Sequence, residues 1–435
     1  MNSVANTDTS CDSKVGQKLR DKGLIFWGVI ASPYQLKMQA LADFGGLPWQ
    51  RWPDQAGFLN ALKTPVHLAR SRRRQTIARF PERVPGLDEY PAVPYYSLDG
   101  DTFYYDSTGL ALHLDHLQAC AQPLLPEEPA LRFICRLIDE AFDEFGLYMV
   151  HHNRWVISAA TNVMGDTTSK EMRKLVPPGG RRRFARILAE RQVRRCCYLF
   201  SAAPPGFSAG VDAKLTVQAR PGFPATHELL NEAWRSYLAA MEQVLCQQPF
   251  LLGDRFTLAD ASAYGQLSMN LIDGRSAELL EQLAPRTFAW LCMIRDGEHT
   301  HSSGKLYLSE HVQPLLEIIS TTFIPLMQQN EAAYCSALSR GQTLFNEAAF
   351  NSGEALYDGT LLGRPFRAVV KTFQVAVWRE LCVHWDALAE REREDGRNGR
   401  TERVERNQRG GGGEPRKAET IDKSACPNES YHGGF

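Results

Sequence analysis

The chain has 435 residues, which predicts two or three domains at roughly 100–200 residues per domain. Hydrophobic residues make up 43% and charged residues 23%, a composition that excludes a chain disordered throughout. Lys and Arg total 49 against 50 Asp and Glu, so the formal net charge is −1 and no overall field attracts nucleic acid or an anionic membrane. Either partner would need a local patch of charge, and we expect neither.

The sequence contains no candidate secretion signal or membrane span. The N-terminal stretch MNSVANTDTSCDSKVGQ lacks a basic segment followed by an apolar one. The apolar run 315–327 is interrupted by Glu317 and Pro325 and is too short to cross a bilayer. The ten cysteines show no CxxC spacing, so we expect reduced thiols in a cytoplasmic protein and no zinc site or other metal.

The first part of the chain mixes strand and helix patterns. The apolar run LIFWGVI, residues 24–30, predicts a buried strand, and residues 34–44 have the apolar spacing of a helix that ends at Gly45-Gly46. The polar residues 1–20 predict a frayed end. Residues 48–91, with their Trp, Pro and Arg clusters, give no clear pattern.

A hairpin signal follows. Two aromatic runs, residues 92–98 and 102–107, flank Asp99-Gly100, which is typical of a tight two-residue turn. Asp106-Ser107 then opens a helix through TGLALHLDHL. The order is therefore strand, helix, unclear segment, hairpin and helix.

Beyond Pro126 only helical patterns are found, which predicts an all-α region. A charged, Gly-rich segment from Glu390 onward predicts a disordered tail. The segment between the last two helical patterns looks like a loop. The helical patterns cover residues 131–155, 181–200, 227–245, 258–271, 279–294, 312–329 and 368–388.

Two sets of motifs carry a family resemblance. The first is FLLGDRFTLADASAYGQL, residues 250–267, in which Thr257 and Asp260 have the spacing of a capping box that starts a helix. The second is ASPYQLKMQAL (31–41), YPAVPYY (90–96) and YYDSTGLALHL (104–114). Through these motifs the sequence resembles the glutathione S-transferases over roughly residues 24–300.

The resemblance implies an architecture. It predicts an α/β thioredoxin-like domain over residues 22–120 and an all-α domain over 125–300. A helical C-terminal extension, 301–388, and the disordered tail, 389–435, have no counterpart in a minimal transferase. The basic stretch 62–85 looks like an insertion.

The resemblance also implies a binding site for glutathione as co-substrate. Ser32, five residues before Lys37, matches the position that contacts the glutathione sulfur, which makes it the candidate catalytic residue. Val93-Pro94 matches the family's cis-proline, at which the Val93 backbone pairs with the cysteinyl part. Asp106 and Ser107 match the acidic–Ser pair that holds the γ-glutamyl end.

The implied function is attack of a glutathione thiolate on a small electrophile, by conjugation or isomerisation. One alternative is a non-catalytic binding or assembly protein on the same fold, and a weaker one is a glutathione-dependent dehalogenase or lyase. The electrophile is not specified by any residue, and the family is commonly homodimeric. We expect no nucleic acid and no membrane among the partners.

Each candidate residue also has a purely structural interpretation. Ser32 is suited to cap the helix that follows, with Pro33 at its first position. Val93-Pro94 is explained by the fold alone, and Asp106-Ser107 by helix initiation. The basic runs 70–79 and 181–195 are interpreted as solvated faces.

Overall fold

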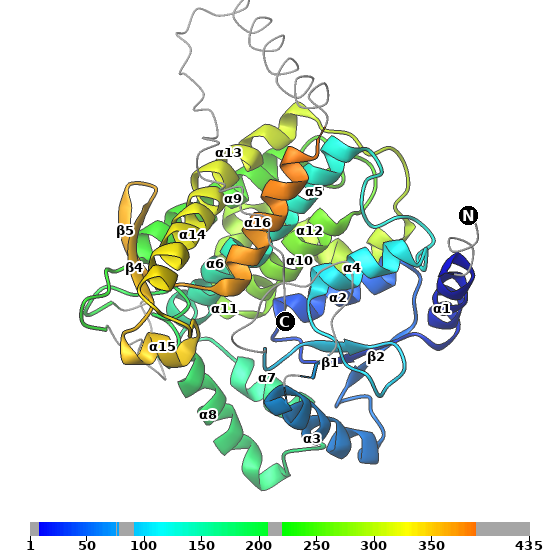
Figure 1. Cartoon of the computed structure of the whole chain (residues 1–435), viewed down its shortest axis with the longest axis horizontal. Coiled ribbons are helices and arrows are strands. Elements are labelled where there is room, and N and C mark those ends of the chain that lie inside the picture. The colour runs from blue at the N-terminus through cyan, green and yellow to red at the C-terminus, as the bar shows by residue number, and fades with distance from the viewer. Residues whose placement is uncertain (1–7, 75, 78–90, 208–219, 389–435) are drawn as a thin grey trace, which may run out of the picture.

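The computed structural model describes residues 8–74, 76–77, 91–207 and 220–388 (Figure 1). The predicted tail 389–435 and residues 78–85 of the predicted insertion lie outside the described residues. The N-terminal half consists of α1 (Asp8–Lys22), β1 (Leu24–Trp27), α2 (Pro33–Phe44), β2 (Trp49–Trp52), α3 (Phe58–Arg74), β3 (Tyr95–Ser97) and α4 (Ser107–His116).

The sheet of this half has the order β2-β1-β3. Strand β1 runs parallel to β2, with α2 as the connection between them, and antiparallel to β3. Tyr104 forms a bridge with Tyr96 and so extends the sheet by one position beyond β3. This order, with α4 following the bridge, is a thioredoxin-like arrangement.

Side chains alternate across the sheet, as the period of two in a strand requires. Phe26 and Tyr96 face the main core, which α2 and α4 also enter. Trp27 and Tyr95 face a second, smaller core, which includes Ala61 and Leu68 of α3 along with Trp52. Helices therefore cover both faces of the sheet, and α3 lies on the side away from α2.

Three expectations for this half need correction. Residues 8–22 form α1, and the buried Leu19 belongs to the main core, so the frayed end predicted for 1–20 is wrong over this range. The hairpin turn is wider than two residues, because the bridge between Tyr96 and Tyr104 leaves residues 97–103 in the turn. Inside it the side chains of Ser97 and Asp99 accept the N–H groups of Gly100 and Thr102, both at 2.8 Å. The unclear segment contains β2 and α3.

The helical half begins with an unbroken helical run from Pro129 to Ile157, in which one π-helical stretch lies between α5 and α6 and a second follows α6. The predicted helix 279–294 is in fact two helices, because Ala284 leaves the helical conformation (φ −146°) directly before Pro285. The helices of this half are α5 (Pro129–Glu140), α6 (Leu147–His152), α7 (Met164–Glu171), α8 (Arg181–Arg194), α9 (His227–Leu245), α10 (Leu258–Leu267), α11 (Gly274–Leu283) and α12 (Pro285–Arg295).

The C-terminal extension packs on this bundle, and α16 lies along α5 (Figure 1). The loop expected between its helical patterns is wrong, because that segment contains α15 and a β-hairpin. Leu362 and Gly363 both have positive φ at the turn, which matches the twist of a two-residue hairpin. The elements are α13 (Gln313–Thr321), α14 (Phe323–Ser339), α15 (Glu347–Ser352), β4 (Leu356–Leu361), β5 (Arg364–Val369) and α16 (Thr372–Asp386).

Helix α10 joins the two halves. Its predicted capping box is present between Thr257 and Asp260, and the Asp260 carboxylate also accepts the backbone N–H of Leu251 at 2.8 Å. Further along the helix, Gly265 lies against α2. A Cβ atom at this glycine would stand 2.7 Å from the carbonyl oxygen of Pro33, so only glycine permits the close approach of the two helices.

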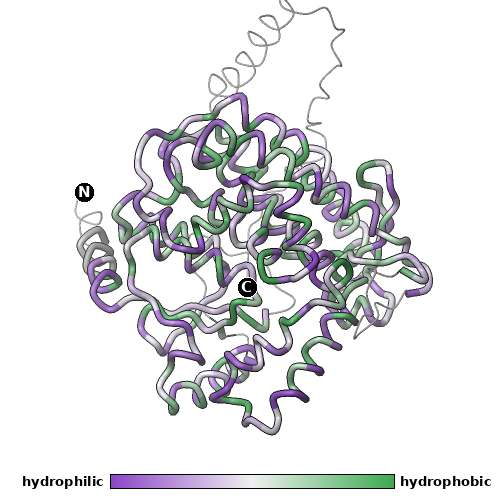
Figure 2. Tube along the Cα trace, turned by 180° about the vertical axis from the view of Figure 1, so that it is seen from behind, coloured by the Kyte–Doolittle hydropathy of each residue, from purple (hydrophilic) through white to green (hydrophobic). Residues whose placement is uncertain are grey.

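The described helices include none that is both long and apolar enough to span a bilayer. Figure 2 shows why: hydrophobic and hydrophilic residues alternate at short intervals along the helical parts of the chain.

Candidate functional site

Ser32 occupies the N-cap position of α2 and is buried. Its carbonyl oxygen accepts the N–H of Gln35 at 3.1 Å, as an N-cap backbone does. Its side chain, however, makes no capping hydrogen bond. The capping interpretation therefore accounts for the backbone of Ser32 but not for its hydroxyl group.

The loop that carries Ser32 is held by side chains of the helical half. The carboxylate of Glu171, at the end of α7, accepts the backbone N–H of Ile30 at 3.2 Å. Arg154 donates from Nη1 to the carbonyl oxygen of Ala31 at 2.9 Å, and its Nε is fixed by Asp273 at 2.6 Å. Both contacts fall within two residues of Ser32, so the helical half sets the position of this loop.

Gln35, in the first turn of α2, is wholly buried. Within the described part of the chain neither its Oε1 nor its Nε2 has a hydrogen-bond partner. A Cβ atom added at Gly28 would meet both Gln35 and Pro94, so this amide lies beside the proline. A buried polar group without a partner costs about 1–3 kcal/mol, which makes Gln35 a candidate for contact with a ligand.

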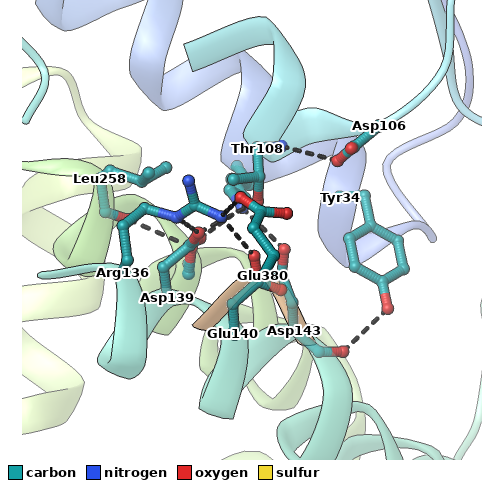
Figure 3. A network of polar contacts seen from close by, with 11 residues as sticks. Tyr34, Asp106, Thr108, Arg136, Asp139, Glu140, Asp143, Leu258 and Glu380 are labelled. Carbon is teal, nitrogen blue, oxygen red and sulfur yellow. Dashed lines mark hydrogen bonds and ion pairs between the residues drawn. The ribbon is translucent and has the colours of Figure 1, made fainter. Parts of the chain in front are cut away.

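Lys37, two residues further along α2, is the centre of a buried polar network. Its Nζ lies 2.6 Å from the Asp139 carboxylate and 2.7 Å from that of Asp143, and it donates to Thr108 Oγ1 at 2.8 Å. Ser262 of α10 also donates to Asp139. Figure 3 shows Thr108 of α4 pointing toward Asp139 of α5, so the network joins the first turn of α4 to the helical half.

The electrostatics of this network follow from burial. Burial alone would lower the pKa of Lys37, but the carboxylates of Asp139 and Asp143 outweigh it and raise that pKa above its usual value. Burial raises the pKa of Asp143 to about 7, although Lys37 opposes the shift. The positive charge of Lys37 is thus balanced by its two carboxylate neighbours.

Arg136 connects the network to the C-terminal extension. Its Nη2 lies 3.0 Å from Glu140 of α5 and 2.7 Å from Glu380 of α16, as Figure 3 shows. Its Nε lies 3.6 Å from Asp139, the carboxylate that Lys37 also contacts. The extension is therefore coupled by charge to the residues behind α2.

The other predicted site residues lie at β3 and α4. The Val93–Pro94 bond is cis, as the resemblance predicted, and Pro94 is buried at the start of β3. Asp106 has φ 79°, an unfavourable conformation for a residue with a side chain, and its Oδ1 accepts the N–H of Thr108 at 3.1 Å. Ser107, the first residue of α4, is buried beside it.

The N-terminus of α4 keeps donors available. Thr108 donates its N–H to the Asp106 side chain, and Leu110 donates to the Asp106 carbonyl oxygen. Among the described residues, the N–H groups of Ser107 and Gly109 have no hydrogen-bond partner. Together with the helix dipole they suit a carboxylate.

The structure therefore gathers the predicted residues at the first turns of α2 and α4 and at the start of β3, linked through Lys37 and Thr108. The sequence did not predict four features of the candidate site: Gln35, the charge-balanced state of Lys37, Arg154 and Glu171. Arg154 and Glu171 lie more than 100 positions from the loop they hold, and no motif marks them. A separate cavity of about 750 Å³, lined by Leu112, Arg132 and Leu388 among others, contains none of the predicted residues.

Comparisons with known proteins support the helical half most directly. Residues 224–291 match the family model described as the glutathione S-transferase C-terminal domain. This range contains the capping box of α10, the whole of α9 and most of α12. No curated protein matches the chain.

Solved structures of low similarity include the β-etherase LigF from Sphingobium sp. strain SYK-6, with 17% identity, a TM-score of 0.37 and coverage of 68% of this chain and 98% of that one. A glutathione S-transferase from Xanthobacter autotrophicus has 16% identity and a TM-score of 0.30, with coverage of 68% of this chain and 99% of that one. A glutathione S-transferase from Pseudomonas fluorescens has 15% identity and a TM-score of 0.25, with coverage of 62% of this chain and 92% of that one.

The fold assignment rests on the sheet order of the N-terminal half, the capping box and the family match. Residues 224–291 match the glutathione S-transferase C-terminal domain, and this match, with the sheet order of the N-terminal half, gives the chain a glutathione S-transferase-like fold.

Proposed function

We propose that the chain binds glutathione at the first turns of α2 and α4 and uses its thiolate to attack a small electrophile. The observation that carries the proposal is the state of Ser32. Its hydroxyl group stands at a helix N-terminus without a capping bond, in a loop that Arg154 and Glu171 hold in place. A positioned hydroxyl group with no hydrogen-bond partner among the described residues is suited to donate to a thiolate.

In this proposal the protein lowers the pKa of the thiol by stabilising its ionised form. The Ser32 hydroxyl donates to the thiolate, and the N-terminal end of α2 adds a favourable dipole. Lys37 does not serve as the counter-charge, because Asp139 and Asp143 already balance it. The thiolate then forms a bond to the electrophile while the leaving group, in a displacement, departs with the electron pair.

The remaining residues would orient glutathione. The N–H groups of Ser107 and Gly109 suit its γ-glutamyl carboxylate, and Asp106 suits the ammonium group beside it. The backbone of Val93, ahead of the cis bond to Pro94, suits the cysteinyl amide. The buried amide of Gln35 lies next to this proline and gains a partner if the ligand reaches it.

Calorimetric titration with glutathione tests the binding site. We expect saturable binding by the wild type, loss of binding in Ser107→Ala, and unchanged binding in the control Ser339→Ala, which alters an exposed serine of α14. Retained affinity in Ser107→Ala would contradict the assignment of α4.

Thiolate absorbance in the ultraviolet tests the role of Ser32. Ser32→Ala is expected to keep most of the affinity and to lose the absorbance of bound thiolate at neutral pH. If the wild type binds no glutathione at millimolar concentration, the transferase proposal is wrong. The non-catalytic binding or assembly protein on the same fold would then take its place.

A further inference from the structure

The outer face of α3 exposes large apolar side chains. Phe58 is 64% exposed, Leu59 66%, Leu62 42% and Val66 57%. Single exposed apolar residues are common on protein surfaces, but four on one helix form a patch that calls for an explanation.

Helix α3 has apolar residues on two sides, one buried and one exposed. Phe58, Leu62 and Val66 are spaced by four residues, so they lie above one another on one side of the helix. Ala61 and Leu68 occupy the opposite side and pack into the small core behind the sheet. The helix therefore satisfies the fold with one face and presents a second apolar face to the outside.

Basic residues continue and flank this stripe. The spacing of four leads from Val66 to Arg70 and Arg74, and α3 contains no Asp or Glu. Among the described residues, none of the basic side chains of α3 forms an ion pair. They are Lys63, Arg70, Arg72, Arg73 and Arg74.

Helix α8 adds charge of the same sign. It lies with α3 at the same end of the molecule, the lower end in Figure 1. Arg182, Arg183 and Arg194 are exposed and have no ion pair within the described chain, and Ile187 beside them is 48% exposed. A second group of exposed basic and apolar side chains therefore lies at the same end of the molecule as α3.

We propose that this face, formed by the outer sides of α3 and α8, docks on the surface of an anionic lipid bilayer. An exposed helix with an apolar stripe between basic residues is the form that lies in a membrane interface, with its apolar side chains below the headgroups and its cations among them. The near-neutral net charge, from which no membrane partner is expected, averages over this local patch.

The mixture of basic and apolar side chains argues against a second copy of the chain and against nucleic acid as the partner of this face. A second copy of the chain would bring a second set of α3 arginines to the interface, and α3 has no Asp or Glu to pair with them. Nucleic acid would pair with the arginines but would leave Leu59 and Val66 without apolar partners. An anionic bilayer satisfies both kinds of side chain at once.

Sedimentation of the intact chain with lipid vesicles tests the proposal. We expect binding to vesicles of phosphatidylcholine mixed with phosphatidylglycerol, weaker binding at high salt, and none to phosphatidylcholine alone. Arg73→Gln with Arg74→Gln should weaken binding about 30-fold, at about 1 kcal/mol for each cation. Leu59→Gln with Leu62→Gln should abolish it.

Matched controls alter equally exposed residues elsewhere. Val383→Gln changes a 65% exposed valine of α16, and Arg235→Gln changes an exposed arginine of α9. Neither should change vesicle binding, and circular dichroism should show all variants folded.

Several results would overturn the proposal. They are equal binding to neutral vesicles, no vesicle binding by the wild type, and unchanged binding by the Leu59/Leu62 variant. Without vesicle binding, a dimer in sedimentation equilibrium that this variant dissociates would assign the face to a second copy. Retention of duplex DNA would assign it to nucleic acid.

Discussion

The Nζ atom of Lys37 lies 2.6 Å from the Asp139 carboxylate, which makes the contact between α2 and α5 a buried ion pair. Desolvation opposes such a pair, and close charges with additional hydrogen bonds offset that cost. Here Thr108 and Ser262 provide the hydrogen bonds to Asp139. The pair therefore depends on two other elements, α4 and α10, being in place.

Replacing Lys37 by Met is expected to lower the free energy of unfolding by about 3–5 kcal/mol, because Asp139 and Asp143 would remain buried without their cation. Urea denaturation measures this loss. The control Arg275→Met removes an exposed pair with Glu278 and should cost less than about 1 kcal/mol. Equal losses in the two variants would contradict a dominant role for the buried pair.

Gly265→Ala is expected to destabilise the protein by about 1–3 kcal/mol, because the added methyl group would stand 2.7 Å from the backbone of α2. Thermal unfolding provides the measurement. Gly179→Ala is the matched control, since a Cβ atom there meets nothing within 4 Å. A stability of Gly265→Ala equal to that of the wild type would mean that α2 and α10 move apart at no cost.

Gln35→Met keeps the shape of the side chain and removes a buried amide that has no partner in the described structure. We expect the free energy of unfolding to rise by about 1–3 kcal/mol without ligand, because the cost of burying the amide disappears. Glutathione should protect the wild type against heat more than it protects the variant. A destabilised variant would show that the amide has a bonding partner in solution.

Acid sensitivity should depend on His152. Its two ring nitrogens lie 3.2 Å from Ser201 Oγ and 2.9 Å from His227 Nδ1, and burial lowers its pKa to about 3. Below its unfolded pKa of about 6.5 the unfolded chain takes up a proton that the native protein does not, so the native state loses stability as pH falls toward 3.

Asp143 and Asp260 have raised pKa values, so their contribution to stability increases as pH falls, opposite to that of His152. The difference in free energy of unfolding between the wild type and His152→Gln isolates the contribution of His152. Between pH 6 and pH 4 the free energy of unfolding of the wild type should fall, relative to that of His152→Gln, by about 1.4 kcal/mol per pH unit. Urea denaturation at several pH values measures the slope. A difference independent of pH would contradict a neutral, buried His152.

The sequence predicted those parts of the fold that depend on local signals. The capping box of Thr257 and Asp260 lies within four consecutive residues, and α9 has the bounds expected from its apolar spacing. The β4–β5 hairpin was missed because its turn, Leu362-Gly363, is not one of the usual turn pairs. Residues 8–22 were missed because α1 contributes few apolar residues to the core, the buried Leu19 and the partly buried Val15, and both stand in a polar stretch.

The candidate site shows the same limit. Ser32, Pro94 and Ser107 could be predicted as site residues because each belongs to a short motif near a helix or strand end. Arg154 and Glu171 act on the Ser32 loop from the helical half, through one backbone atom each. Contacts of a side chain with a distant backbone group leave no pattern in a single sequence, so only the folded structure reveals them.

The Arg136–Glu380 ion pair joins residues 244 positions apart, and this has a consequence for synthesis on the ribosome. At about 5–20 residues per second, roughly 12–50 s pass between the emergence of α5 and that of α16. During that interval the side of α5 that α16 later covers stays open, with Phe133 still lacking its ring contact with Trp385. Chaperones that recognise apolar segments have their best opportunity on this nascent chain then.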